Sequence, residues 1–175
     1  PGGARLRARL WGGGPVLSVS LVCVGKLKEK FYRDACAEYQ KRLSAFCKLA
    51  VVEIPEEALP QEPSRAQIDA ALEREASAIR SKLPSSTSLV CLCVEGKLCS
   101  SPELAGLVRS WEQSSAKHLA FVIGGSYGLA QSLKAEAWLR LSMSPMTFPH
   151  HLARVMVLEQ LYRAVQINAG SKYHK

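Results

Sequence analysis

The 175-residue sequence lacks the motifs that mark several common classes of protein. It has no apolar run close to the roughly 18 residues needed to span a bilayer, which favours a soluble, cytoplasmic protein without a membrane partner. It contains no G-x-x-x-x-G-K-[ST] loop, no G-x-S-x-G nucleophile elbow and no H-E-x-x-H motif. A nucleoside triphosphatase, a serine hydrolase and a zinc protease therefore find little support. The glycines do not form the full G-x-G-x-x-G fingerprint, so a dinucleotide-binding enzyme is weakly supported too.

Paired cysteines are also missing, although the sequence contains six cysteines. None forms a C-x-x-C pair, and no Cys/His spacing suggests a zinc site. Cys23, Cys91 and Cys93 lie in apolar, strand-like runs, where a thiol behaves as a small hydrophobic group. We therefore predict reduced, buried thiols in an intracellular protein that holds no metal.

Acidic residues are scarce, with 15 Asp and Glu against 23 Lys and Arg and a net charge of +8. Residues 53–75 hold seven acids and two bases, a local net charge of −5, which leaves +13 for the rest of the chain. A basic surface with one acidic flank favours a polyanionic partner, of which nucleic acid is the commonest. The net charge by itself is about equally consistent with a soluble basic protein that binds no nucleic acid.

Strand-like and helical stretches alternate along the chain. The expected strands cover residues 16–24, 49–54, 88–94, 118–123 and about 138–143; the expected helices cover 28–46, 67–83, 101 to about 114, a short stretch after 129, and 149 to about 168. In the first helix, the spacing places Phe31, Ala35, Tyr39 and Leu43 on one apolar face. This alternation predicts an α/β fold with a mostly parallel sheet. Residues 1–15, rich in Gly and Arg, are expected to form a flexible extension to one domain at 16–175.

Three segments rich in turn residues are expected directly after strands, at residues 95–97, 124–128 and 142–149. Ligands of open α/β sheets bind beyond the carboxyl ends of the strands. Gly124 and Gly125 would allow a ligand to approach the backbone closely, although a plain turn explains an isolated GGSYG equally well. Pro149 starts the last helix beside two histidines, where free amide groups favour an anionic group.

Three of the four histidines, His150, His151 and His174, lie in the last 26 residues. Beside a polar loop and a basic tail, they favour a site over isolated structural roles. The last helix is strongly apolar, which predicts burial in the core or at a subunit interface. Glu159 and Arg163 on that helix are spaced for a simple i,i+4 ion pair.

Beyond the extension, the sequence resembles the ribosomal large-subunit methyltransferase H family of SPOUT enzymes. The resemblance is carried by VGKLKEKFYRDACAEYQKRL, LVCLCVEGK and FVIGGSYGL, and most specifically by LSMSPMTFPHHLARVMVLEQLYRA with the terminal YHK. It implies a sheet with helices on both faces, whose C-terminal part forms a trefoil knot, and a homodimer. It also implies S-adenosylmethionine as methyl donor and N3-methylation of a pseudouridine in the 23S RNA of assembled ribosomes.

The same resemblance implies which residues form the site. Those expected to bind S-adenosylmethionine are Leu92, Gly124, Gly125, Ser144, Pro145, Met146, Thr147, Phe148 and Pro149. Those expected on the substrate side, as catalytic residues, are His150, Arg154, Tyr173 and His174. The chain closes with Lys175, whereas some family members have an arginine and an acid after the Y-H, which puts a bidentate arginine role in doubt.

The expected chemistry needs the N3 imide to lose a proton, and histidine titrates near neutral pH. His174 is the first candidate for the base and His150 the second. Alternatively, water accepts the proton and the histidines hold phosphate. Two other functions stay open: a basic nucleic-acid-binding module without catalysis, and a methyltransferase for transfer RNA or another ribosomal site.

Overall fold

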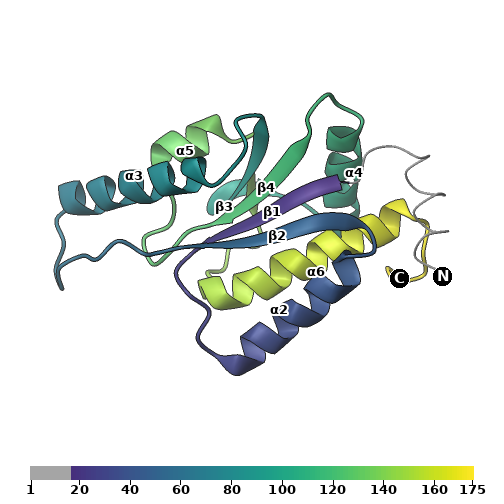
Figure 1. The fold of residues 1–175 in the computed structure, drawn as a ribbon, viewed down its shortest axis with the longest axis horizontal. Coiled ribbons are helices and arrows are strands. Elements are labelled where there is room, and N and C mark those ends of the chain that lie inside the picture. The colour runs from purple at the N-terminus through teal and green to yellow at the C-terminus, as the bar shows by residue number, and fades with distance from the viewer. Residues whose placement is uncertain (1–16) are drawn as a thin grey trace.

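Five parallel strands form a single sheet in the computed structural model, which describes residues 17–175 (Figure 1). The strands are β1 (Leu17–Val24), β2 (Cys47–Ile54), β3 (Thr87–Leu98), β4 (His118–Ile123) and β5 (Leu139–Ser142), in the order β2-β1-β4-β3-β5. The predicted α/β fold with a parallel sheet is confirmed. The expected extension at residues 1–15, and residue 16, lie outside the described residues. The trefoil knot stays a prediction.

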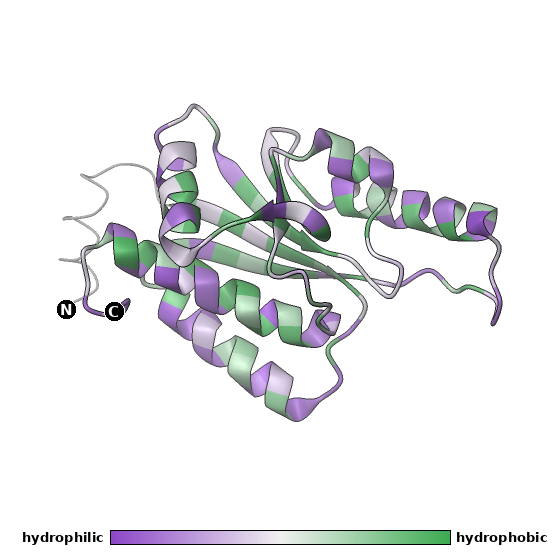
Figure 2. Ribbon diagram, turned by 180° about the vertical axis from the view of Figure 1, so that it is seen from behind, coloured by the Kyte–Doolittle hydropathy of each residue, from purple (hydrophilic) through white to green (hydrophobic). Residues whose placement is uncertain are grey.

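Helices cover both faces of the sheet, as the resemblance implied. One face carries α2 (Lys30–Leu43), α4 (Ser101–Glu112) and α6 (His150–Asn168); the other carries α3 (Arg65–Ser81) and α5 (Gln131–Glu136). In both views α2 and α6 lie side by side, and α3 and α5 lie across the sheet from them (Figures 1 and 2).

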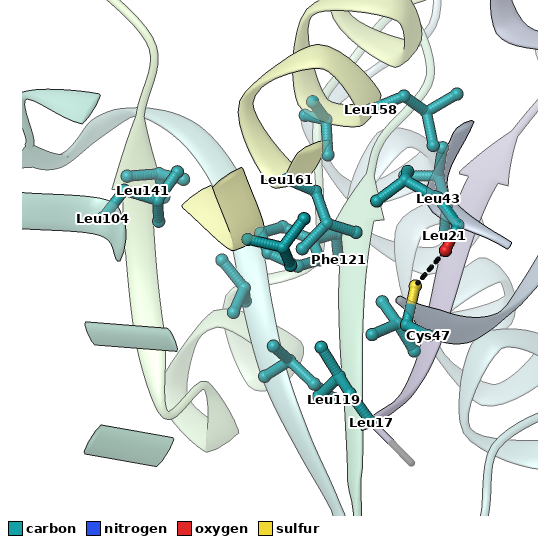
Figure 3. Packing of buried hydrophobic residues seen from close by; sticks show 14 of the residues in the cluster. Leu17, Leu21, Leu43, Cys47, Leu104, Leu119, Phe121, Leu141, Leu158 and Leu161 are labelled. Atoms are coloured by element: carbon teal, nitrogen blue, oxygen red, sulfur yellow. Dashed lines mark hydrogen bonds between the residues drawn. The ribbon is translucent and has the colours of Figure 1, made fainter. Parts of the chain in front are cut away.

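Side chains of the strands alternate between two hydrophobic cores. On β1, Leu21 packs in the core beneath α2 and α6, whereas Val22 packs in the core beneath α3. Figure 3 shows the first core, where Phe121 of β4 lies against Leu161 of α6. Strands buried on both faces read as continuous apolar runs. This explains why the sequence located β1 and β4 within a residue of their observed ends.

The buried face of α2 differs from the predicted one. Leu43 is fully buried, but Phe31, which the sequence placed on the same face, is 65% exposed, and Cys36 is buried instead. Steps of four residues drift by about 40° each around a helix of 3.6 residues per turn, so three steps separate Phe31 from Leu43 by about 120°. Phe31 therefore faces away from the core.

The predicted end of the third strand is also wrong. Residues 95–97 lie within β3, because the strand continues to Leu98 after an irregularity in which Leu92 and Lys97 both pair with Leu141 of β5. A β-carbon on Gly96 would lie 2.7 Å from the carbonyl carbon of Leu141. Glycine therefore lets the bulged strand stay close to β5.

Candidate active site

A pocket of about 700 Å³ lies at the carboxyl edge of the sheet. The chain leaves β4 toward α5 on one face, whereas it leaves the neighbouring β3 toward α4 on the other face. Such a reversal opens a crevice beyond the strand ends, where open α/β sheets bind ligands. The volume falls within the range of about 300–1,000 Å³ that is usual for small-molecule sites.

The structure brings most of the expected donor-binding residues together around this pocket. Those that line it are Leu92, Gly124, Gly125, Ser144, Met146, Thr147, Phe148 and Pro149. Pro145 belongs to the same loop but does not line the pocket, and His150 at the start of α6 does. Three segments that are distant in sequence thus meet at one place, as the parallel strand order requires.

Glycine is required in the turn that follows β4. A β-carbon on Gly124 would overlap the carbonyl group of Gly128, and Gly128 itself adopts a φ of +81°. The Gly128 amide donates a hydrogen bond of 3.1 Å to the Gly125 carbonyl. The turn therefore exposes bare backbone to the pocket, in a conformation that other residues rarely adopt.

Glu56 supports the same turn from the loop after β2, and the sequence analysis missed it. Its carboxylate accepts a hydrogen bond of 3.0 Å from the backbone N–H of Ser126. This hydrogen bond is the main reason that the pKa of Glu56 is lowered. A β-carbon on Gly125 would lie only 2.6 Å from the Glu56 carboxylate, so the turn and Glu56 fit closely. The signal available in the sequence was that Glu56 also follows a strand at this edge.

His150 is the titratable group best placed in the pocket. Its ring lies 3.9 Å, centroid to centroid, from that of His151, and its Nε2 is 3.7 Å from where a β-carbon of Gly25 would lie. Burial lowers the pKa of His150, and the charges of His151 and Arg154 lower it further. The imidazole is therefore neutral at neutral pH, with a ring nitrogen able to accept a proton.

Arg154 is buried beneath His150 and does not line the pocket. It is 2% exposed, and its guanidinium donates to the Gly25 carbonyl at 2.6 Å and to Glu53 at 2.9 Å. Burial alone would raise the pKa of Glu53, but hydrogen bonds from Arg154 and from the Leu27 amide outweigh it and lower the pKa. Arg154 thus ties α6 to the ends of β1 and β2.

The C-terminal tail folds back against the middle of α6 and does not line this pocket. Tyr173 donates a hydrogen bond of 3.2 Å to Glu159, and Arg163 donates one of 3.3 Å to Nδ1 of His174. The expected ion pair between Glu159 and Arg163 is confirmed at 2.5 Å. Glu159 follows His150 by nine residues, about 13 Å along a helix. Within one chain, the structure does not bring His174 to His150.

A second, apolar groove of about 450 Å³ adjoins the pocket. It lies between α4, α6 and the end of β5, and it shares Leu141, Ser142 and Met143 with the pocket. Val155 and Met156 of α6 line it and are only partly buried. The helix therefore presents an apolar strip outside the core as well as inside it.

No metal-binding group emerges from residues 17–175: no three His, Cys, Asp or Glu side chains gather there as ligands would. None of the six cysteines, which all lie in the described range, forms a disulfide, and burial raises the pKa of Cys23 and of Cys91 to about 12. None of the helices in the described part of the chain is long and apolar enough to cross a membrane.

Comparisons with known proteins show the family of the chain. The chain matches a family described as predicted SPOUT methyltransferases over residues 17–174. It is 42% identical over 159 residues to the ribosomal RNA large subunit methyltransferase H of Streptococcus equi subsp. equi, covering 91% of this chain and all of that protein. The protein of the same name from Oenococcus oeni is 39% identical over 160 residues, with the same coverage.

Solved structures support the fold. A protein from Bordetella pertussis Tohama I, described as a probable methyltransferase, superposes with a TM-score of 0.55 at 18% identity, covering 93% of this chain and 98% of that one. A protein from Haemophilus influenzae Rd KW20, described as a probable methylase family protein, gives a TM-score of 0.53 at 10% identity, covering 92% of this chain and 70% of that one. At these identities the likeness concerns the fold alone.

Proposed function

The chain belongs to the SPOUT methyltransferase family, and we propose that it methylates large-subunit ribosomal RNA with S-adenosylmethionine as the methyl donor. The observation that carries the proposal is the pocket, which collects the β4 glycine turn, the loop at residues 144–149 and a neutral histidine. The relatives named as ribosomal RNA methyltransferases match over their full length. The finer proposal is N3-methylation of a pseudouridine in 23S RNA.

The residues of the pocket fit the methyl donor. S-adenosylmethionine supplies an electrophilic methyl group on a sulfonium, together with an adenosine and an amino-acid carboxylate. Leu92, Leu129 and Phe148 offer apolar walls, and the turn at Gly124–Gly128 offers bare backbone. The start of α6 at His150 offers unpaired amide groups, which favour a carboxylate at the positive end of the helix dipole.

The proton of the acceptor nitrogen needs a destination during transfer. The imide N3 of pseudouridine is weakly acidic, and it attacks the methyl carbon as its proton leaves. We assign the proton to a ring nitrogen of His150, because this imidazole is neutral and borders the pocket. The bond from nitrogen to carbon forms while the bond from carbon to sulfur breaks. His174 stays the alternative base.

A homodimer would explain how residues of the tail take part in a site that the tail of the same chain does not line. Tyr173 and His174 cannot serve the pocket of their own chain as placed, but a partner's tail could reach it. The apolar groove lined by Val155 and Met156 adjoins the pocket and is the surface we assign to the partner. Val155→Asp should place an unpaired charge there and yield a monomer in light scattering. A dimer of unchanged strength would contradict this assignment.

The proposed function is tested with ribosomes from a bacterial strain that lacks this methyl group. The full chain and S-adenosylmethionine with a labelled methyl should methylate assembled ribosomes, and mass spectrometry should place the methyl on N3 of a pseudouridine. Naked ribosomal RNA should react little, because the chain carries no added RNA-binding module in residues 17–175. The rate should fall with salt as phosphate contacts weaken. Binding without methyl transfer would instead indicate a non-catalytic nucleic-acid-binding module.

A further inference from the structure

The segment between β1 and the first turn of α2 presents basic side chains beside an exposed aromatic ring. Lys26, Lys28, Lys30 and Arg33 are all exposed, and so is Phe31, at 65%. Lys30 pairs with Asp34 at 2.6 Å. Lys26 and Lys28 make no ion pair with any residue in the described range 17–175. Two cations and one aromatic face are therefore free for a partner.

A series of rings connects this segment to the pocket. The ring of Phe31 lies 4.4 Å from that of Tyr32, measured between centroids, and Tyr32 lies 6.0 Å from His151. His151 in turn lies 3.9 Å from His150, which lines the pocket. The carboxylate of Glu29, which precedes α2, also lies 3.5 Å from Nδ1 of His151, so the starts of α2 and α6 are close together. The exposed ring is thus continuous with the candidate active site.

We propose that residues 26–33 receive an unpaired strand of the RNA substrate, with Phe31 stacking on a base beside the target nucleotide and Lys26 and Lys28 contacting its phosphates. The proposal rests on the proposed function, whose substrate it places on this surface. Aromatic side chains among lysines are the usual means of binding single-stranded RNA, since bases stack and phosphates pair with cations. A second copy of the chain fits less well, because the surface that we assign to a partner chain is the largely apolar groove at Val155 and Met156 and not this cationic segment.

The test measures methylation of ribosomes that lack the methyl group, with KM for ribosomes separated from kcat. Phe31→Ala should raise KM roughly tenfold, the scale of losing one stacked base, and Phe31→Tyr should restore it. Calorimetric affinity for S-adenosylmethionine should stay unchanged in both variants. The matched control is Trp138→Ala, since Trp138 is 43% exposed but precedes β5 at the opposite edge of the sheet, and its KM should equal that of the parent.

The lysines are tested by the dependence of KM on salt. Lys26→Ala combined with Lys28→Ala should raise KM and make the slope of log KM against log salt concentration shallower by about 1.4, since each lost contact with a phosphate of a single strand removes about 0.7. Lys82→Ala combined with Lys117→Ala removes two exposed lysines elsewhere and should change neither.

Three results would overturn the inference in distinguishable ways. If the parent methylates ribosomes but Phe31→Ala has an unchanged KM, residues 26–33 do not bind the RNA. The proposed function is then unaffected. A change from dimer to monomer in Phe31→Ala, seen by light scattering, assigns the surface to a second copy of the chain. If the parent neither methylates ribosomes nor co-sediments with them, both the proposed function and the proposed RNA-binding role of residues 26–33 are wrong.

Discussion

The start and the middle of α6 lie beside the same kinds of side chain in different surroundings. At its start, His150 borders a pocket of about 700 Å³, above a buried arginine that ties the helix to two strand ends. Around its middle, the tail residues His174 and Tyr173 lie against Arg163 and Glu159 without lining that pocket. Residue types alone therefore do not define the site. The ends of the strands fix the position of the site, and only the start of α6 lies beside them.

The two places also differ in whether their side chains can accept a proton. The pKa of His150 is lowered, first by burial, so the ring is neutral and can accept a proton. Burial, reinforced by the charge of Glu159, raises the pKa of Tyr173 to about 12, so its hydroxyl stays protonated and donates a hydrogen bond. His150 is therefore better suited to accept a proton than Tyr173 is.

The largest expected effect comes from removing the tail. Deleting residues 173–175 should leave folding and S-adenosylmethionine binding nearly unchanged but reduce methyl transfer about a hundredfold, the scale of losing a positioned catalytic group. His174→Ala should reproduce much of this loss. Mixing the truncated chain with Gly124→Val, whose turn cannot close, should restore activity, because one chain supplies the tail and the other the pocket. Truncated chains with the parental rate would leave His150 as the residue to test.

The two arginines of α6 should differ in their contribution to stability. Arg154→Met removes the donor of the Gly25 carbonyl and of Glu53, and should cost about 2 kcal/mol, less than a fully buried pair because Glu53 is 41% exposed. Arg163→Met breaks the i,i+4 pair with Glu159 and should cost less than about 1 kcal/mol. Urea unfolding of both variants measures the difference. Equal losses in the free energy of unfolding would mean that Arg154 and Arg163 anchor α6 equally strongly.

A smaller effect is expected from Glu56, which acts on the pocket only through the glycine turn. Glu56→Ala should weaken S-adenosylmethionine binding about threefold to tenfold, because the Ser126 amide loses its partly exposed charged acceptor. Glu56→Gln keeps an oxygen that can accept this hydrogen bond and should bind nearly as the parent does. Calorimetric titration compares them. Equal weakening in both variants would assign the effect to charge rather than to the turn.

The smallest expected effect is a shift in pH dependence. The pKa of His150 lies below its ordinary value of 6.5, so kcat/KM should persist below pH 6.5 and then fall as the ring protonates. Arg154→Met should move this acid limb to higher pH, since the arginine charge helps to lower the pKa. In His150→Gln the limb should disappear. Its survival there, with loss in His174→Gln, would identify His174 as the base.

The same lowered pKa makes stability depend on pH. Around pH 6 the unfolded chain binds more protons at this position than the folded chain, so folding stability falls as the pH drops below 6.5. His118, held between Ser18 and Ser20, has a pKa lowered by burial and adds to the same trend. His118→Gln should flatten the dependence slightly without affecting methyl transfer.

Much of the fold could be predicted because local patterns dictate it. Buried parallel strands are continuous apolar runs, and Ile123 followed by two glycines marks the end of β4. The predictions were wrong where the spacing of apolar residues is a poor guide to burial or to the end of a strand. Phe31 fits an i,i+4 series that drifts around the helix, and the sequence predicted that β3 ends at Val94 because the bulged segment resembles a turn.

The sequence by itself determined the strand and helix order, and with it the three segments that meet at one edge of the sheet. The tertiary structure alone decided which of the proposed residues share that edge. Glu56 reaches the glycine turn, Arg154 lies buried beneath His150, and His174 lies against Arg163, away from the pocket. These outcomes depend on the length of a helix and on contacts between distant segments, which no local pattern of residues records.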